Sequence, residues 1–458
     1  MKFESIYSVY FLGIGGIGMS SLASYFHILG KNVAGYDLSP SAITDDLQKS
    51  GIKIHFNEDP DQISQEFQDK EHSLVVYTPA VPQDHKELEY FVEHNFTIKK
   101  RAEVLGILFN VKKGIAIAGT HGKTSVTSMC AFILHNSKLK CSAFLGGIVK
   151  NISSNLIIQE NSLWMVAEAD EYDRSFLQLK PEIALITWVD ADHLDIYSSI
   201  KDIKETFEKF LSQVNNGGKI ILKDGIDLKF NDEIVTSYTY SFDNPKSDFY
   251  AKNIRCKMGR YSFEIATPGS DIQDITLQYR GLTNIENAVA AASIAYLAGV
   301  DTPVIAASLS AFEGVRRRFD VQYEDEKNIY IDDYAHHPRE LDAIIGSVRK
   351  LYPGKRITGV FQPHLYSRTR DFADEFAVSL SALDELILLD IYPAREKPIA
   401  GISSKSIFDK VTIQAKTLCS KNDLLEILKI RKPEILLTMG AGDIDRYVDD
   451  IRIMFETK

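Results

Sequence analysis

The chain has 458 residues and a mass of 51.5 kDa, which is too long for one compact hydrophobic core and predicts two to four domains. Hydrophobic residues make up 45% and charged residues 25% of it, the proportions of a globular protein in water. The net charge of −11 excludes general nucleic-acid binding, which requires a basic face, but it permits a local phosphate site.

No apolar run is long enough to span a membrane, and the N-terminus lacks the sustained apolar segment of a signal peptide. The four cysteines form no CxxC pair, which is typical of reduced thiols. We therefore expect a cytoplasmic protein, most simply an enzyme.

Apolar strands alternate with helical patterns from the N-terminus onward, which predicts α/β architecture. In the first domain, residues 1–107, strands are expected at 6–12, 32–36 and 73–77, and helices at 19–29 and 86–94. In the central domain, residues 108–318, strands are expected at 114–118, 164–167 and 183–189, and helices at 125–134, 201–213 and 285–297. Residues 217–280 alternate polar and apolar side chains, which indicates a small antiparallel extension.

A third α/β domain is expected over residues 319–458. Its strands are predicted at 329–331, 356–361, 385–389 and 434–439, with helices between them.

A glycine-rich loop joins the first strand to the first helix. Its candidate ligand-binding residues are Gly13, Gly15, Gly16, Ile17 and Gly18, with Asp37 at the end of the next strand. This pattern brings a pyrophosphate close to a helix N-terminus. Because dinucleotides and nucleotide sugars both carry a pyrophosphate, the motif alone does not select the ligand.

A second loop follows the strand at 114–118. It consists of Gly119, Thr120, His121, Gly122, Lys123 and Thr124, and Ser125 continues into the helix. Backbone N–H groups and the Lys123 ammonium suit a triphosphate, and the Thr124 hydroxyl suits Mg²⁺. Ile117 stands where a standard Walker A motif has its first glycine, so the loop belongs to a distinct class of ATP users.

Two polar segments follow strands of the central domain. Residues 168–173 are rich in carboxylates, and Glu168, nearest the strand, is the first candidate for Mg²⁺. In the segment 190–195, His193 is placed to bind a second cation or a phosphate oxygen.

The third domain carries further candidates after its strands. Arg368 and Arg370 suit a carboxylate or a transferring phosphoryl group, although pairing with Asp371 and Asp374 is an equally good interpretation. The turn at 440–443 is interpreted as a close backbone approach that serves packing.

Together these segments resemble the Mur ligase family, the ATP-dependent amino-acid ligases of peptidoglycan synthesis, over essentially the whole chain. The matching motifs are residues 119–124, 168–171, 192–195, 317–319 and 336–338. The loop at 13–19 and residues 361–364 and 367–371 point to the member that adds L-alanine.

The resemblance implies a Rossmann-like N-terminal domain for the UDP sugar, a central P-loop ATPase-type domain with a mostly parallel sheet, and a Rossmann-like C-terminal domain. It implies an acyl phosphate formed from ATP and the lactyl carboxylate of UDP-N-acetylmuramate, which the amine of L-alanine then attacks. ATP and Mg²⁺ or Mn²⁺ are the implied cofactors, and the protein would be a monomer or homodimer.

Several residue roles rest on the resemblance alone. Asn284 and Asn287 would lie on the adenine side of ATP, and His336, with Arg368 or Arg370, near the amino acid and the phosphoryl group. Lys123 would contact the β- and γ-phosphates. The metal ligands would be Thr124, Glu168 and His193.

Three positions depart from the family pattern: Tyr172, Trp188 and Thr283. Tyrosine at 172 also occurs in the ligase that recycles murein tripeptide, which is the alternative within the family. Alternatives of other classes are an NAD-dependent oxidoreductase, which leaves residues 119–124 unexplained, and a catalytically silent nucleotide-binding regulator.

Overall fold

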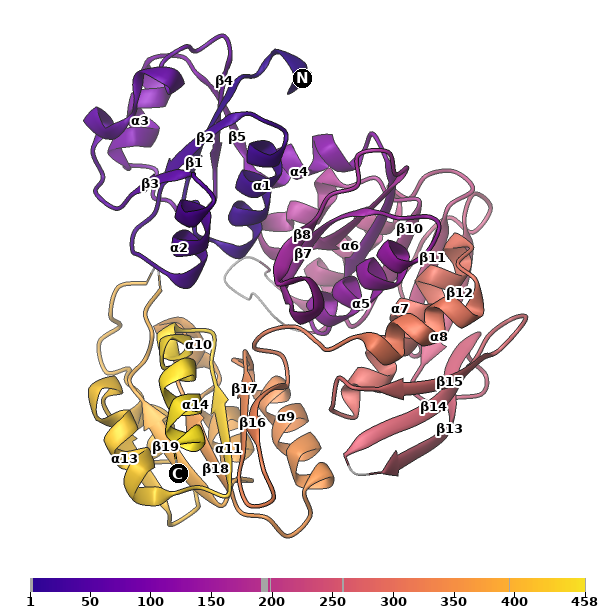
Figure 1. Ribbon diagram of the computed structural model, residues 1–458, viewed down its shortest axis with the longest axis vertical. Coiled ribbons are helices and arrows are strands. Elements are labelled where there is room, and N and C mark those ends of the chain that lie inside the picture. The colour runs from indigo at the N-terminus through magenta and orange to yellow at the C-terminus, as the bar shows by residue number, and fades with distance from the viewer. Residues whose placement is uncertain (1–2, 191–196, 198, 258, 395, 458) are drawn as a thin grey trace. The chain divides into compact units, whose positions relative to one another are not determined.

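The computed structural model describes residues 3–190, 197, 199–257, 259–394 and 396–457. The chain forms three sheets in chain order (Figure 1), and its contacts divide it into two compact units. The first unit comprises Met1–Ile254, Ser262–Thr276 and Glu286–Phe312, and the second Arg255–Tyr261, Leu277–Ile285 and Glu313–Lys458. The three-domain α/β fold expected from the sequence is confirmed, whereas the boundaries at 107 and 318 stay predictions.

The N-terminal sheet is parallel, in the order β3-β2-β1-β4-β5. Its strands are β1 (Ser8–Leu12), β2 (Asn32–Tyr36), β3 (Lys53–His55), β4 (Ser73–Tyr77) and β5 (Thr97–Lys100). The helices are α1 (Ile17–Ile28), α2 (Ala42–Lys49), α3 (Lys86–Glu93) and α4 (Arg101–Phe109). Val9 and Phe11 pack on one side of β1 and Tyr10 and Leu12 on the other, because helices cover both faces (Figure 1).

The central sheet has the order β15-β14-β13-β12-β11-β10-β6-β9-β7-β8. Its strands are β6 (Lys113–Ala118), β7 (Ser142–Val149), β8 (Ser154–Ile157), β9 (Trp164–Ala169), β10 (Ile183–Ile186), β11 (Lys219–Lys223), β12 (Thr236–Ser241), β13 (Phe249–Lys257), β14 (Arg260–Ala266) and β15 (Ile272–Leu277). The helices are α5 (Lys123–Asn136), α6 (Ile200–Leu211), α7 (Thr283–Ala298) and α8 (Thr302–Ala311). The pairs from β13 through β12, β11, β10, β6 and β9 to β7 are parallel, which agrees with the predicted mostly parallel sheet. The antiparallel extension expected over 217–280 is wrong for β11, β12 and the pairing of β12 with β13, because these strands continue the parallel sheet.

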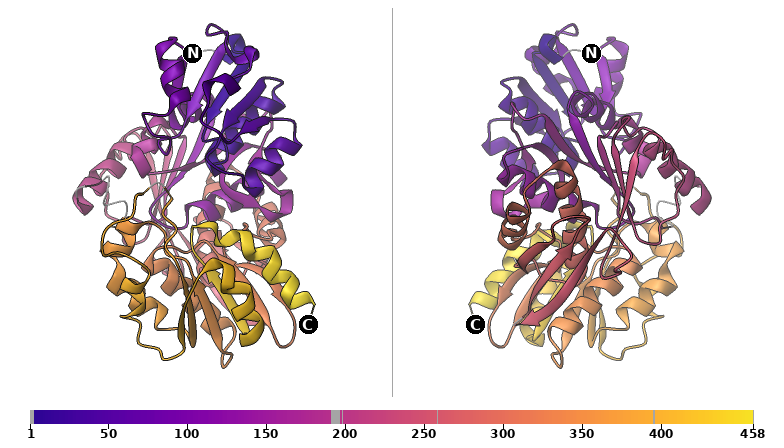
Figure 2. Two further views of the ribbon diagram at one scale, coloured as in Figure 1. Left: turned by 90° about the vertical axis from the view of Figure 1, so that its left-hand side faces the viewer. Right: turned by 90° about the vertical axis from the view of Figure 1, so that its right-hand side faces the viewer.

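The C-terminal sheet has the order β16-β17-β21-β18-β19-β20, and only the pair β16–β17 is antiparallel among the pairings described. Its strands are β16 (Asp320–Glu324), β17 (Ile329–Asp333), β18 (Ile357–Phe361), β19 (Glu385–Leu389), β20 (Lys416–Cys419) and β21 (Ile435–Met439). The helices are α9 (Pro338–Leu351), α10 (Tyr366–Asp371), α11 (Ala373–Leu380), α12 (Lys405–Phe408), α13 (Leu424–Arg431) and α14 (Val448–Glu456), which lie on both faces of this sheet (Figure 2).

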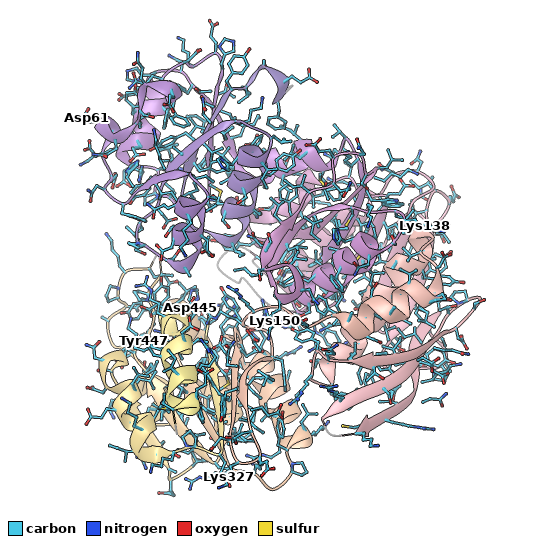
Figure 3. The ribbon with its side chains drawn as sticks, viewed as in Figure 1. Asp61, Lys138, Lys150, Lys327, Asp445 and Tyr447 are labelled. Carbon is cyan, nitrogen blue, oxygen red and sulfur yellow. The ribbon has the colours of Figure 1, made fainter. Side chains whose placement is uncertain are left out.

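Short 3-10 helices complete the secondary structure: Phe3–Ser5, Pro60–Gln62, Gln65–Phe67, Lys150–Ile152, Tyr172–Gln178, Lys421–Asp423 and Asp443–Tyr447. Charged side chains such as Asp61, Lys138 and Lys327 stand on the outside (Figure 3). Among the described residues, no helix combines the length and the apolar character that crossing a membrane requires.

A polar cluster is buried between the N-terminal sheet and α3. The Tyr10 hydroxyl donates to Oε2 of Glu87 at 2.7 Å and lies 2.7 Å from Nε2 of His55. Glu87 is fully buried, and this burial raises the pKa of its carboxyl to about 7, against the opposing effect of the Tyr10 hydrogen bond. Because the folded chain binds this proton more tightly than the unfolded chain, ionisation of Glu87 weakens the fold.

We expect Glu87→Gln to remove a pH-dependent loss of stability. In the wild type the free energy of unfolding should fall as the pH rises from 5 to 8, by on the order of 3 kcal/mol from this group, because Glu87 must ionise in its buried site. Urea denaturation at several pH values measures the effect. The exposed Glu89 on the same helix provides the control variant Glu89→Gln, and parallel pH profiles for wild type and Glu87→Gln would contradict the prediction.

Candidate active site

Three neighbouring strands of the central sheet end at the predicted triphosphate loop. Ala118 at the end of β6 lies opposite Ala169 of β9 and Ile186 of β10. The chain leaves β6 through residues 119–122, and α5 begins directly after Gly122, whose φ is +81°. This strand–loop–helix arrangement turns the first N–H groups of α5 toward the loop, where an anion is favoured.

The loop is supported from behind by the segment after β10. Gly119 has φ +129°, and a Cβ atom there would lie 2.2 Å from Oγ1 of Thr187. The Thr187 hydroxyl donates to the carbonyls of Ala118 and His121, and Thr120 N–H donates to the Trp188 carbonyl at 3.0 Å. Only glycine fits at position 119, because both the backbone conformation and the space exclude a side chain.

Lys123 is held by a carboxylate that the sequence did not single out. Its ammonium donates to the Gly119 carbonyl at 2.7 Å and to both carboxylate oxygens of Glu171 at 2.8 Å. Burial acts to lower the pKa of Lys123, but the carboxylates of Glu171, Asp170 and Glu168 outweigh it and raise the pKa above its usual value. The ammonium is therefore charged and fixed at the loop.

Glu168 and Thr124, the two described metal-ligand candidates, contact each other beside the loop. Thr124 Oγ1 donates to Oε1 of Glu168 at 3.2 Å. Glu168 lies inside β9 and not after it, because β9 continues to Ala169. A Cβ atom on Gly146 of β7 would lie 2.0 Å from Oε2 of Glu168, so glycine there makes room for the carboxylate.

A hydroxyl and a carboxylate at a phosphate loop fit Mg²⁺, which takes one or two such protein ligands together with phosphate oxygens. His193, the predicted third ligand, lies outside the described residues. Among the described residues, no cluster of three or more His, Cys, Asp and Glu side chains forms a closed metal site.

The first glycine loop is closed by its own acidic residue. The N–H groups of Gly13 and Ile14 donate to the Tyr36 carbonyl, and Gly15 N–H donates to Oδ2 of Asp37 at 2.7 Å. Gly16 then precedes α1 with an extended backbone. The N–H groups at the start of α1 face the loop, which is the geometry of a pyrophosphate site.

The two predicted adenine-side asparagines belong to different compact units. In the first unit, a Cβ atom on Gly122 would lie 3.1 Å from Oδ1 of Asn287, so Asn287 lies beside the triphosphate loop. In the second unit, Asn284 is buried and its amide donates to the Arg280 carbonyl.

Trp188, which departs from the family pattern, supports the loop region. Its indole N–H donates to the Asp190 carboxylate, and the Lys223 ammonium lies 3.7 Å from the ring centroid. Lys223 also pairs with Glu286 at 2.9 Å. The Trp188 ring therefore provides an aromatic face that holds the Lys223 ammonium.

The ends of β17, β21 and β18 also meet, because Met439 lies opposite both Asp333 and Phe361. His336 follows directly after β17. Its Nδ1 atom lies 3.1 Å from the Tyr334 carbonyl oxygen and 3.2 Å from Oε2 of Glu340. Burial lowers the pKa of His336 to about 4, with Arg368 acting in the same direction, so the imidazole is neutral at pH 7.

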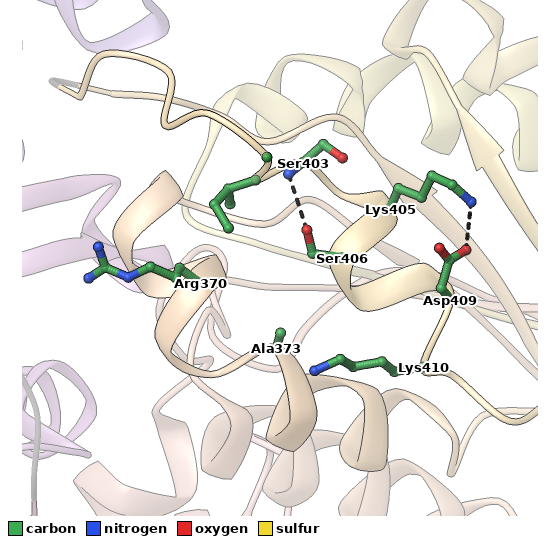
Figure 4. Close-up of a pocket in the computed structure, with 9 residues that line it drawn as sticks. Arg370, Ala373, Ser403, Lys405, Ser406, Asp409 and Lys410 are labelled. Atoms are coloured by element: carbon green, nitrogen blue, oxygen red, sulfur yellow. Dashed lines mark hydrogen bonds and ion pairs between the residues drawn. The ribbon is translucent and has the colours of Figure 1, made fainter.

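Arg368 joins this group, whereas Arg370 does not. The His336 and His364 rings are 6.1 Å apart, and Nη1 of Arg368 lies 3.5 Å from Nδ1 of His364. Arg370 instead pairs with Asp371 at 2.7 Å and lines an open pocket of about 470 Å³ with Lys405 and Lys410 (Figure 4). Because Arg368 and Arg370 are two residues apart on α10, their side chains leave the helix on different sides.

The turn at 440–443 packs against β18, as interpreted from the sequence. A Cβ atom on Gly440 would lie 2.6 Å from the Gln362 carbonyl, and one on Gly442 would lie 2.3 Å from Oε1 of Gln362. Arg317 also serves the fold, since it donates to the Gly440 carbonyl and pairs with the buried Asp332.

Comparison with known proteins covers the whole chain. Residues 8–113 match the family described as "Mur ligase family, catalytic domain", residues 117–295 the "Mur ligase middle domain", and residues 317–442 the "Mur ligase, glutamate ligase domain". The chain is 50% identical to the UDP-N-acetylmuramate–L-alanine ligase of Parabacteroides distasonis, covering 99% of this chain and 98% of the relative. It is 48% identical to the ligase of the same name from Porphyromonas gingivalis, covering 98% and 99%.

Solved structures share the fold. The UDP-N-acetylmuramate–alanine ligase of Thermotoga maritima superposes with a TM-score of 0.83 at 24% identity, over 98% of this chain and 99% of that one. A murein peptide ligase from Psychrobacter arcticus gives a TM-score of 0.71 at 21% identity, over 99% of both chains.

The chain belongs to the Mur ligase family. Its two phosphate loops, its C-terminal site and its full-length relatives agree in this assignment. It is an enzyme, a ligase of peptidoglycan precursor synthesis.

We expect the Lys123–Glu171 pair to be strongly coupled in stability. Glu171→Gln should lower the free energy of unfolding by about 3–5 kcal/mol, because it leaves a buried ammonium without its carboxylate. Lys123→Met combined with Glu171→Gln should restore much of this loss. A double-mutant cycle by urea denaturation measures the coupling, and additive effects of the two changes would contradict it.

Proposed function

We propose that the chain joins L-alanine to the lactyl carboxylate of UDP-N-acetylmuramate, coupled to the cleavage of ATP to ADP and phosphate. The observation that carries this proposal is the presence of both phosphate loops in one compact unit, with a fixed ammonium at the second loop. The names of the full-length relatives support the same substrates. An oxidoreductase has no use for the second loop.

Two substitution steps make up the reaction. A carboxylate oxygen of the sugar attacks the γ-phosphorus of ATP, the bond to the β-phosphate oxygen breaks, and ADP leaves. The neutral amine of L-alanine then attacks the acyl phosphate carbon, phosphate leaves with the bonding electrons of the C–O bond, and the amine loses a proton as the amide forms.

The central residues offset the repulsion between carboxylate and triphosphate. Lys123 would contact the β- and γ-phosphates, and Gly119, Thr120, His121, Gly122 and Ser125 would surround them with backbone and hydroxyl donors. Thr124 and Glu168, with His193, would hold Mg²⁺ or Mn²⁺, which supplies positive charge to the phosphate oxygens. Such electrostatic stabilisation is usually the largest contribution to catalysis of this kind.

The remaining predicted residues have complementary tasks. The loop formed by Gly13, Gly15, Gly16, Ile17 and Gly18 would bind the UDP pyrophosphate, with Asp37 holding the loop in shape. Asn284 and Asn287 would face adenine. In the C-terminal domain, Arg368 would meet an anion and the neutral His336 would lie near the amino acid. We place the enzyme in the cytoplasm as a monomer or homodimer.

The proposal predicts ADP formation only when UDP-N-acetylmuramate and L-alanine are both present. A coupled assay of ADP across amino acids measures this, with the murein tripeptide L-alanyl-γ-D-glutamyl-meso-diaminopimelate as the rival substrate. Activity with the tripeptide and none with L-alanine would overturn the proposal in favour of the recycling ligase. Absence of activity with both would favour a silent nucleotide-binding protein.

Lys123→Ala provides the matched variant for this assay. It should abolish turnover, because no other described side chain donates at its position in the loop, while binding of UDP-N-acetylmuramate survives. Loss of sugar-nucleotide binding in Lys123→Ala would contradict two separate phosphate sites.

We expect Arg368→Ala to reduce kcat by about 10²–10³, since removal of one good electrostatic donor typically costs that much. Arg370→Ala should leave kcat within about twofold, because Arg370 pairs with Asp371 away from His336. Steady-state kinetics of both purified variants measure the difference. Equal losses in the two variants would refute the distinction.

A further inference from the structure

Arg101, at the first position of α4, packs directly on the first glycine loop. A Cβ atom on Gly18 would lie 2.8 Å from Nη1 and 3.3 Å from Cζ of Arg101. The guanidinium therefore lies against the Cα atom of Gly18 in the first turn of α1, and any larger residue at position 18 would push it away. This close approach gives Gly18 a role that the motif alone does not explain.

The guanidinium is weakly held by the protein. Within the described part of the chain it forms one ion pair, with Asp170 at 4.0 Å, and its N–H groups donate no hydrogen bond to the protein. The neighbouring cations are held more tightly, since Lys100 donates to Asp173 at 2.9 Å and Arg174 to Asp202 at 3.0 Å. Arg101 thus keeps donors available, with 22% of its side chain exposed.

The position of this charge is electrostatically unfavourable without a ligand. A helix N-terminus carries a partial positive charge, so a cation beside the first turn of α1 is repelled by it. An anion bound between the N–H groups of α1 and the guanidinium would reverse the sign of this interaction. The arrangement therefore fits a site that is completed by an anionic ligand.

We propose that Arg101 binds the pyrophosphate of the UDP sugar and holds it against the start of α1. A guanidinium can donate two parallel hydrogen bonds to phosphate oxygens, which fixes orientation as well as charge. Its Asp170 contact joins it to the segment that carries Glu171, the partner of Lys123. The identity of the nucleotide sugar rests on the proposed function.

The test compares uridine nucleotides by calorimetry on Arg101→Met, Arg101→Lys and wild type. We expect Arg101→Met to lower the affinity for UDP, UDP-N-acetylglucosamine and UDP-N-acetylmuramate alike by about 10- to 100-fold. This is the typical contribution of hydrogen bonds to a charged group. Arg101→Lys should recover part of this affinity. The ADP affinity of each variant should stay within about twofold of wild type, which shows that the central domain remains folded.

Lys100→Met is the matched control, because Lys100 is adjacent and charged but pairs with Asp173. It should leave the affinity for all three uridine nucleotides within about twofold. Unchanged affinities in Arg101→Met would overturn the role of Arg101 alone. A loss of affinity in Arg101→Met that is confined to UDP-N-acetylmuramate would also overturn it, because Arg101 would then bind the lactyl carboxylate. An equal loss of affinity for ADP would overturn it as well. Failure of the wild type to bind any uridine nucleotide would overturn the proposed function as well.

Discussion

The structure depends on one electrostatic constraint, which is that the buried Lys123 ammonium at the loop after β6 must be accompanied by negative charge. A buried ammonium is costly unless a carboxylate accompanies it. Glu171 supplies that carboxylate, with both oxygens 2.8 Å from the Lys123 ammonium. The ammonium is therefore charged and held in place at the loop by the protein itself.

Parallel strand order is what places these groups together. Because β6 lies between β9 and β10, the loop after β6 receives Glu168 from one neighbour and the support of Thr187 from the other. The C-terminal domain repeats the principle, since β17, β21 and β18 bring His336, the turn at 440–443 and Arg368 to one edge. Ligands of parallel α/β sheets bind at such edges for this reason.

Sequence patterns predicted the strands well where residues are uniformly apolar. The strands at 32–36, 73–77 and 385–389 were predicted with the bounds that the structure has. The sequence pattern missed the end of β9, because a charged residue such as Glu168 is more typical of a loop than of a buried strand. Its place in β9 depends on Gly146 of β7, which leaves space for the carboxylate and is distant in sequence. It also passed over Glu171, because burial inside an acidic run depends on contacts distant in sequence.

The glycine-rich loop shows how geometry narrows a motif. In a dinucleotide-binding domain the acidic residue after the second strand receives the ribose hydroxyls. Here Oδ2 of Asp37 accepts the Gly15 N–H and so holds the loop itself. Arg101, whose guanidinium lies on Gly18, adds a cation that a nicotinamide fingerprint does not require. The Asp37 carboxylate that a redox dinucleotide would use for its ribose hydroxyls is therefore occupied by the backbone of the loop, and this disfavours a nicotinamide cofactor at this loop.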